Sequence, residues 1–543
     1  GLDAVTVVTG GADGQDIVLG ADLTTGITGA RQALVLNAGS GGDILVAGGV
    51  GTNGQALGEV TIVGADQVNF DEAVYASGFT QAAGNVTTGQ TTFADRIELA
   101  DGLDFTGGGL TLGNTTIVGA DLQVNNARLM TKGSAGDLTV VGEFAQTGEG
   151  GVTLENNRVS VGRAMRVTGP LTVGNDVTVT AQQIDVQSTI DSAIDGNYRL
   201  TLDAQESIEL SGTIGQSRRL GTLVTGDSGE LTLNTTLVST TGTQDYNVPL
   251  AFLQGSLNDP LVLNSQFGDI DFGRNVSAGQ GAKGATRSLD VQAGNGNVFV
   301  RDQIGVSLVG VRYRDYQNSV DTNPYRLNVT AADIWLNADV TTFENQLYDG
   351  RVHIGNSGTN GLTRLLVSLD PSIVFTGTID DTVGMTHHLD VRAVTTNPQN
   401  GLLPEIRFDS GVGQTVALGG LSAFAGIQNK MPDSLAGQVL TEPASMRFGR
   451  VSIDGDISTG GDQTYVGGSI EVGANDGDKV SLNSEYGQIS LLARPTPDAG
   501  LSNADNLEIL LGDEASLSQE AIDLIKLTGL SLSDIAAYVG FYG

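Results

Sequence analysis

The chain has 543 residues, with 78 glycines, 11 prolines and an apolar content of 39%. This length exceeds that of a domain built around a single hydrophobic core, so we expect several domains or one elongated repeat array. The apolar content excludes a disordered chain. A net charge of −35 excludes nucleic acid and anionic lipid as expected partners, and the absence of cysteine excludes disulfides and thiolate metal sites. No apolar run has the length of a transmembrane helix.

Residues 1–30 are expected to form an N-terminal strand or cap segment. They begin at Gly1 without an initiator methionine or signal peptide, which fits a processed form or a fragment. The stretch "GADGQDIVL" from Gly11 resembles a calcium-binding nonapeptide with Asp13 and Asp16 as ligands. Such sites need consecutive copies, because adjacent turns complete the oxygen shell. Only one imperfect copy is present, so a turn is the preferred interpretation.

Residues 31–510 contain a recurring unit. It reads "LVLNAGSGGDILVAGGVG" from Leu34, "LTLDAQESIELSGTIG" from Leu200, "LDVQAGNGNVFVRDQIG" from Leu289 and "LDVRAVTTNPQNGLLPEIRFDSGVG" from Leu389. Apolar and polar residues alternate, which predicts strands with one buried face. The positions predicted to face inward are Leu34, Leu36, Ile44, Leu200, Leu202, Ile208, Leu289, Val291, Val298, Leu389 and Val391.

A glycine-rich phosphate loop is an alternative interpretation of "GSGG" and "GGVG" in the first copy. Phosphate loops place their glycines between a strand and a helix N-terminus. Here the glycines lie between two predicted strands, and the same slot is filled by "AGSGGD", "AQES" and "AGNGN" in different copies. Turn geometry tolerates this variation in length, whereas a phosphate site does not, so we interpret these segments as turns.

Two architectures remain for these short strands: stacked antiparallel sandwiches, or a parallel β-helix in which the strands come from successive turns of a coil. No helical segment separates the strands, which argues against βαβ units. Two-residue Asn-Gly hairpin turns are nearly absent, and the repeat has no fixed length, so the β-helix is favoured. With roughly 20–25 residues per coil, its body is expected to be on the order of 100 Å long.

Residues 511–543 are expected to form a short helical cap or assembly segment. Ser518 is a suitable helix N-cap, and Gly529 is a suitable stop. An apolar stripe at helical spacing lies between them, formed by Ala521, Ile522, Leu524, Ile525 and Leu527.

A second module precedes three copies of the repeat, as "IDVQSTID" from Ile184, "DIDFGRNV" from Asp269 and "IVFTGTID" from Ile373. In order, these motifs resemble the repeats of filamentous-haemagglutinin-type large exoproteins of Gram-negative bacteria. The resemblance covers roughly residues 30–490. It implies a right-handed parallel β-helix, export to the cell surface, and a role in adhesion or matrix formation.

Residues with catalytic or metal-binding chemistry are few. The histidines are His353, His387 and His388, and the adjacent pair points to opposite faces of a strand, so we expect no zinc site. The Asp380–Asp381 pair is compatible with the carboxylates of β-helical glycosidases, but adjacent acids in "TIDDTVG" fit a turn better. We therefore assign no catalytic, cofactor-binding or metal-binding residue.

Basic and aromatic clusters offer an alternative, because they suit anionic sugars or a solvated outer face. These candidate residues are Arg218, Arg219, Arg312, Tyr313, Arg314, Tyr316 and Tyr325.

The favoured hypothesis is an extracellular or cell-surface β-helical protein without enzymatic activity that associates with itself to form or decorate a fibre or biofilm matrix. Two alternatives stay open: a polysaccharide-active lyase or hydrolase, and a carbohydrate-binding adhesin that uses exposed tyrosines.

Overall fold

The computed structural model describes residues 4–9, 15–24, 31–81, 89–253, 259–279, 287–305, 323–355, 363–369, 372–395, 403–427, 449–472, 480–493 and 507–511. It divides into two compact units, Gly1–Val248 (unit 1) and Pro249–Gly543 (unit 2). Within the described residues the regular elements are all strands, paired in parallel, and no helix is present. That part of the chain therefore offers no helix of the length and apolarity needed to cross a membrane.

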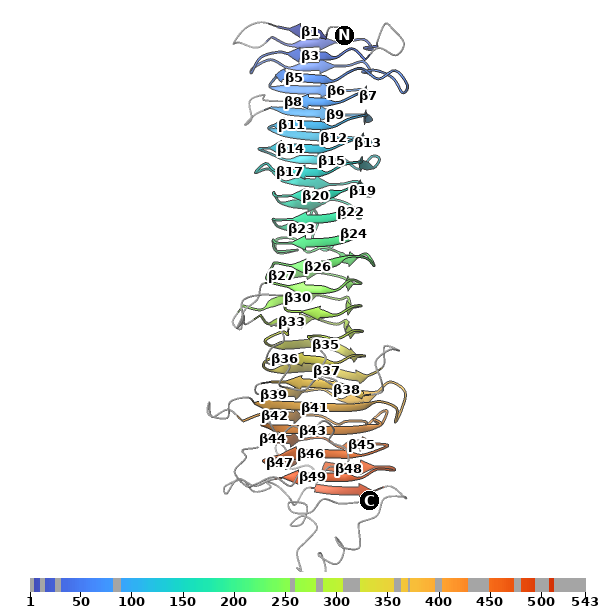
Figure 1. Ribbon diagram of the computed structural model, residues 1–543, viewed down its shortest axis with the longest axis vertical. Helices are drawn as coiled ribbons and strands as arrows, with labels where there is room; N and C mark the ends of the chain where they lie inside the picture. Colours follow the sequence, from blue (N-terminus) through green and yellow to red (C-terminus); the bar gives the residue numbers. More distant parts are fainter. Residues whose placement is uncertain are drawn as a thin grey trace, which may run out of the picture. The chain divides into compact units, whose positions relative to one another are not determined.

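In unit 1 the strands stack in three columns, visible as successive levels from blue to green in Figure 1. Column 1 consists of β1 (Val5–Val8), β3 (Leu34–Asn37), β5 (Val60–Gly64), β8 (Phe79–Gln81), β11 (Leu103–Gly107), β14 (Leu122–Asn126), β17 (Phe144–Gln146), β20 (Ala164–Val167), the second halves of β22 (Val177–Val186) and β24 (Arg199–Leu210), and β26 (Glu230–Leu233).

Columns 2 and 3 follow the same rule of parallel, in-register pairing. Column 2 consists of β2 (Ile17–Leu19), β4 (Ile44–Val46), β6 (Gln67–Phe70), β9 (Gln90–Phe93), β12 (Gly109–Leu112), β15 (Met130–Lys132), β18 (Val152–Leu154), β21 (Leu171–Val173) and β23 (Ile190–Ser192), and isolated bridges extend it to β27 (Leu237–Thr240). Column 3 consists of β7 (Val74–Ala76), β10 (Ile97–Leu99), β13 (Thr116–Val118), β16 (Leu138–Val140), β19 (Arg158–Val161), the first halves of β22 and β24, β25 (Thr222–Thr225) and β28 (Gln244–Tyr246).

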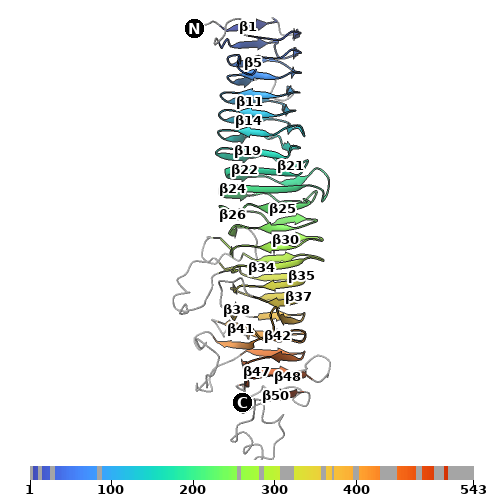
Figure 2. The same ribbon diagram turned by 90° about the vertical axis from the view of Figure 1, so that its right-hand side faces the viewer.

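Unit 2 also has three columns, which Figure 2 shows from the side. Column 4 consists of β30 (Leu261–Ser265), β33 (Leu289–Gln292), the first halves of β35 (Leu327–Leu336) and β37 (Gln346–Ile354), β39 (Ser372–Phe375), β42 (Glu405–Phe408), β44 (Arg450–Ile453) and β47 (Ser469–Val472). Column 5 consists of β31 (Ile270–Phe272), β34 (Asn297–Val300), the second halves of β35 and β37, β40 (Ile379–Asp381), β45 (Ile457–Thr459), β48 (Val480–Ser484) and β50 (Leu507–Leu511).

Column 6 begins with two short strands and continues through isolated bridges before it widens. Its strands are β29 (Leu250–Phe252), β32 (Val276–Ser277), β36 (Val340–Thr342), β38 (Thr363–Ser368), β41 (His388–Thr395), β43 (Gly420–Ile427), β46 (Gln463–Gly467) and β49 (Ile489–Ala493).

The chain visits the columns of a unit in a constant order, and we call each such passage a rung. In unit 1, for example, β5, β6 and β7 occupy columns 1, 2 and 3, and β8, β9 and β10 repeat the order. Rung length varies because the connecting turns differ. Paired positions lie 22 residues apart at Val124 and Gln146 but 45 apart at Glu405 and Arg450.

Alternating side chains from all three columns of unit 1 form its core. Buried and partly exposed positions alternate along most strands, as period-two geometry requires. Phe70 and Phe93 of column 2 stack with centroids 4.8 Å apart, and Phe79 of column 1 meets Phe93 edge-on at 5.1 Å. The columns therefore enclose one apolar interior.

Carboxylates just before strands link several rungs to the next one. Asp121, before β14, accepts the backbone N–H of Glu143, before β17, at 2.8 Å. Because each acceptor satisfies a donor at the edge of the next strand, these charges are structural. The same link is made by Asp16, Asp22, Asp43, Asp176, Asp269, Asp339, Asp456 and Asp462.

The structure confirms an all-β chain with parallel sheets. The predicted inward positions are all buried: Leu34, the most exposed, retains 6% of its surface, and Val291 retains 1%. The expected C-terminal helix is not supported. Residue 511, where that segment was to begin, ends strand β50, and residues 512–543 lie outside the described part of the chain.

Candidate functional site

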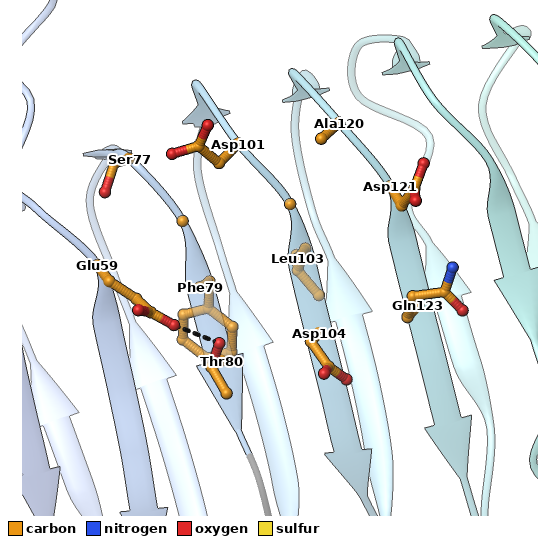
Figure 3. A pocket seen from close by; sticks show the side chains of 12 residues that line it. Glu59, Ser77, Phe79, Thr80, Asp101, Leu103, Asp104, Ala120, Asp121 and Gln123 are labelled. Carbon is orange, nitrogen blue, oxygen red and sulfur yellow. Dashed lines mark hydrogen bonds between the residues drawn. The ribbon is translucent and has the colours of Figure 1, made fainter.

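A groove of about 370 Å³ is lined by residues from four successive rungs of unit 1 (Figure 3). Thr80 on β8, Asp104 on β11 and Gln123 on β14 lie along it on the outer face of column 1. The acidic side chains of Asp101 and Asp121 come from the turns that precede β11 and β14. Leu103 and Leu122 are buried, so the alternation along β11 and β14 places the neighbouring side chains on the outer face.

The groove exists because two successive rungs carry glycine where the next carries aspartate. Gly78 and Gly102 line it, and Asp121 follows in the same row. A Cβ atom on Gly102 would lie 3.0 Å from the backbone oxygen of Asp121, closer than an ordinary contact. A side chain on Gly102 therefore requires its neighbours to move.

Carboxylates dominate the electrostatics of the groove. Glu59 accepts a 2.5 Å hydrogen bond from Thr80 Oγ1, while Asp121 Oδ1 lies 2.5 Å from Arg163. The backbone N–H of Glu143 and then Arg163 hold the pKa of Asp121 below its usual value. Such a surface suits hydroxyl-rich or cationic ligands. Among the described residues, no group of three or more His, Cys, Asp or Glu side chains is arranged to hold a metal ion.

Asp380 and Asp381, predicted to be turn residues, end strand β40 and hold the turns around it. Asp380 Oδ1 accepts the backbone N–H groups of Thr415 and Val416 at 2.9 and 3.1 Å. Asp381 accepts the N–H groups of Val383, Thr386 and His387, and its Oδ1 lies 2.6 Å from Nδ1 of His387. Burial acts to raise the pKa of Asp381, but these hydrogen bonds together lower it.

His388 takes part in a different contact, on the outer face of column 6. Its Nε2 lies 3.1 Å from Ser422 Oγ, a distance within reach of a base and a nucleophile. The ring reaches Ser422 across Gly420, where a Cβ atom would lie 2.3 Å from Nδ1. Burial lowers the pKa of His388, opposed by Asp390 and Asp462. Asp390 is held by two short hydrogen bonds from Arg392, so it does not orient the imidazole as a third member of a triad would.

His353 belongs to an aromatic row on the outer face of column 5. Its ring stacks on Trp335 at 4.3 Å, and Trp335 in turn stacks on Phe299 at 6.1 Å. The guanidinium of Arg301 lies over the Phe299 ring, 5.0 Å from its centroid, and Asp333 accepts from His353 Nε2 at 2.8 Å. Because the ring faces cover one another, they do not form an open platform for a sugar.

The remaining sequence candidates are dispersed. Arg218 contacts the backbone of Ala193, and both Arg218 and Arg219 have their N–H groups held by aspartates of the preceding rung. Tyr325 donates its backbone N–H to Arg287. Asp16 Oδ1 accepts the backbone N–H of Asp43 in the next rung, at 2.9 Å. Asp13, Arg312, Tyr313, Arg314 and Tyr316 lie outside the described residues.

A recurring buried triad is a feature that our reading of the sequence missed. It has the pattern Thr-x-x-x-Gln-x-Tyr, in which glutamine donates to the threonine hydroxyl and accepts from the tyrosine hydroxyl. The glutamine-to-threonine distances are 3.3, 3.2 and 3.1 Å, and the tyrosine-to-glutamine distances are 2.8, 2.8 and 3.1 Å. Burial raises the pKa of each tyrosine. The triads are Thr240–Gln244–Tyr246, Thr342–Gln346–Tyr348 and Thr459–Gln463–Tyr465.

These triads occupy corners where the chain leaves one column and enters the next. Each threonine ends one strand and each tyrosine ends or continues the next, as in β36 and β37. The signal was present in the sequence as "TTGTQDY", "TFENQLY" and "TGGDQTY".

Comparisons of the chain with protein-family models, with curated proteins and with solved structures found no match.

Proposed function

We propose that the chain is a right-handed parallel β-helix that builds or decorates an extracellular or cell-surface fibre, without enzymatic activity. One observation carries this proposal: within each unit the chain passes through three columns in a constant order, and the strands pair in parallel with their counterparts one rung later. Each added rung extends such a fold without changing its cross-section, which suits a protein whose task is to span a distance.

The chemistry of the surface supports the same proposal. Aspartates connect rungs through hydrogen bonds. The net charge of −35 makes non-specific pairing between the strand edges of different molecules less favourable. The order of the repeats, which resembles that of filamentous-haemagglutinin-type exoproteins, agrees with a location outside the cell.

Sedimentation velocity over a wide range of protein concentration tests this proposal. A β-helical fibre subunit has a high frictional ratio and forms larger species as the concentration rises, because exposed strand ends can pair between copies. A single species with the frictional ratio of a compact globule at every concentration would contradict the proposal.

A polysaccharide-active enzyme is the second candidate, and the groove in unit 1 is the observation that favours it. Its exposed carboxylates, among them Asp101 and Asp104, are the groups that glycoside hydrolysis uses. The test is to incubate the full chain with a panel of acidic and neutral polysaccharides and to measure new reducing ends. Cleavage that disappears in Asp104→Asn but persists in Asp185→Asn, an outward position on β22, would establish this candidate in place of the first.

A further inference from the structure

The corner between columns 5 and 6 of unit 2 carries a cluster of exposed apolar residues. Val383 and Met385 belong to the turn between β40 and β41, and Tyr486 belongs to the turn between β48 and β49, three rungs later. They expose 65%, 45% and 62% of their surface, respectively. Both turns meet at Gly460, where a Cβ atom would lie 2.8 Å from the Met385 side chain, and whose carbonyl accepts the backbone N–H of Tyr486 at 2.8 Å. We call Val383, Met385 and Tyr486 the apolar corner.

The turn that carries two of these residues is held by hydrogen bonds. Asp381 accepts three of its backbone N–H groups, at 2.8 to 3.0 Å. The N–H of Met385 donates to the carbonyl of Ala417 in the next rung at 2.7 Å, and Thr386 Oγ1 donates to the carbonyl of Val383 at 2.8 Å. Side chains on a turn that is already fixed lose little conformational entropy when a partner binds.

Met385 has a backbone conformation that its own side chain disfavours. Its φ is 57°, and in the described part of the chain it is the one residue other than glycine with a positive φ. Glycine adopts this conformation without a steric penalty, whereas a residue with a Cβ atom is strained there. Strained residues concentrate at sites of binding and switching. The turn thus presents a half-exposed methionine where glycine would fold more easily, which indicates that the side chain serves a contact.

The ring of Tyr486 is not needed by its own turn. The turn "NSEYGQI" contains Tyr486, and "NSQFGDI" earlier in unit 2 is the same turn with Phe267 in its place. In both turns the serine hydroxyl accepts the N–H of the glycine, at 2.9 and 3.0 Å. One rung after Phe267, "QAGNGNV" has Asn295 at the corresponding position. Serine and glycine therefore shape the turn, and the exposed ring is left for contact with a partner.

We propose that the apolar corner binds a short segment of another protein in which apolar side chains are flanked by lysine or arginine. Methionine adapts its shape to apolar partners, and methionine and tyrosine are enriched at the centres of protein interfaces. The inference holds whether or not the chain forms fibres.

The charges around the apolar corner define the flanking residues of the partner. Glu485 precedes Tyr486, and Asp462 accepts a backbone N–H from the same turn at 2.9 Å. Carboxylates at the edge of an apolar patch attract a cationic partner and repel an acidic one. Lysine and arginine are absent from the sequence of the four turns stacked at this corner, which are residues 382–387, 413–419, 460–462 and 485–488.

Two other occupants fit the apolar corner less well. The three residues expose an area on the order of 300 Å², the size of a functional patch on a monomer, whereas a stable dimer buries about 800 Å² per partner. A second copy also carries a net charge of −35, so it is repelled. Sugar recognition relies on several convergent polar groups beside an aromatic face, and the side chains of Val383 and Met385 offer no such groups.

The experiment measures the fluorescence anisotropy of a labelled synthetic peptide, Lys-Lys-Leu-Phe-Leu-Lys-Lys, titrated with the full chain. The peptide Lys-Lys-Ser-Gly-Ser-Lys-Lys has the same charge and measures binding by electrostatics alone. Tyr486→Ala and Met385→Gly remove the apolar corner, and glycine suits the positive φ, so the turn should remain intact. Phe267→Ala is the matched control, because Phe267 is also 62% exposed, in the same kind of turn but outside the corner.

Wild type and Phe267→Ala should bind the apolar peptide at least about tenfold more tightly than the serine peptide, as a buried aromatic anchor predicts. Tyr486→Ala and Met385→Gly should lose this preference, while circular dichroism and urea unfolding show that they are folded.

Equal affinity of wild type for the two peptides would overturn the inference. An unchanged preference in both folded corner variants, or an equal loss in Phe267→Ala, would overturn the assignment to this corner. A wild-type dimer that Tyr486→Ala dissociates would identify a second copy as the occupant instead. Binding to phosphatidylcholine vesicles that the corner variants abolish, without a preference between the peptides, would identify a lipid surface.

Discussion

The buried triad at the corner between β36 and β37 allows a quantitative test of how the rungs are held. The Gln346 side chain is fully buried; its Nε2 donates to Thr342 Oγ1 at 3.2 Å and to the carbonyl of Val367 at 2.7 Å. Its Oε1 accepts from the Tyr348 hydroxyl at 2.8 Å. Tyr348→Phe removes this donor but keeps the ring, which stacks on Phe375 at 5.1 Å.

Tyr348→Phe should lower the free energy of unfolding by about 1–3 kcal/mol, because it leaves a buried acceptor without a partner. Gln346→Leu should lower it further, since both the Tyr348 hydroxyl and the Val367 carbonyl then lose a hydrogen bond. The double variant should be less destabilised than the sum of the two, with a coupling of about 0.5–3 kcal/mol, because replacing both partners removes the orphaned groups.

Urea unfolding followed by tryptophan fluorescence is the appropriate assay. Trp335 is the single tryptophan of the chain, and β35, which contains it, pairs directly with β37. Tyr75→Phe, at a partly exposed position on β7, is the control and should change the free energy by less than about 0.5 kcal/mol. Wild-type stability in Tyr348→Phe, or strictly additive effects in the double variant, would refute a structural role for the triad.

Three further predictions concern pH, the turn after β40 and the C-terminal segment. Burial lowers the pKa of Lys132 to about 8, from 10.5 in an unfolded chain, so the folded state binds fewer protons between these values and the stability that this group contributes rises with pH. Relative to Lys132→Met, wild type should gain about 3 kcal/mol from pH 7 to pH 10.5 in urea titrations followed by circular dichroism, and parallel curves would disprove the assignment. Asp381→Ala should lower the free energy of unfolding by about 3 kcal/mol because it orphans several buried donors, whereas any polysaccharide cleavage should be unaffected; loss of cleavage in a stable variant would reverse this interpretation. Deletion of residues 530–543 should yield destabilised monomers if the segment is a cap, or stable monomers without filaments if it drives assembly, and wild-type behaviour in both respects would rule out both roles.

Alternation along the chain was enough to predict which residues form the core. Leu34 and Val291 were identified because period two assigns a face to every residue of a strand, whatever the length of the connecting turn. The turn interpretation of the glycine-rich segments rested on their variable length between strands, and Gly39 of the first copy has a φ of 74°.

The sites were harder to predict because they depend on which rungs are neighbours. The groove needs Gly78 and Gly102 to align with Asp121, and the contact between His388 and Ser422 joins residues 34 positions apart. Rung length varies too widely for such pairs to be inferred from spacing.

Electron microscopy of the purified full chain tests the central proposal most directly. A β-helical fibre subunit should appear as narrow rods of uniform width that join end to end into filaments as the concentration rises. Compact globular particles at all concentrations would contradict the proposed fold and function together.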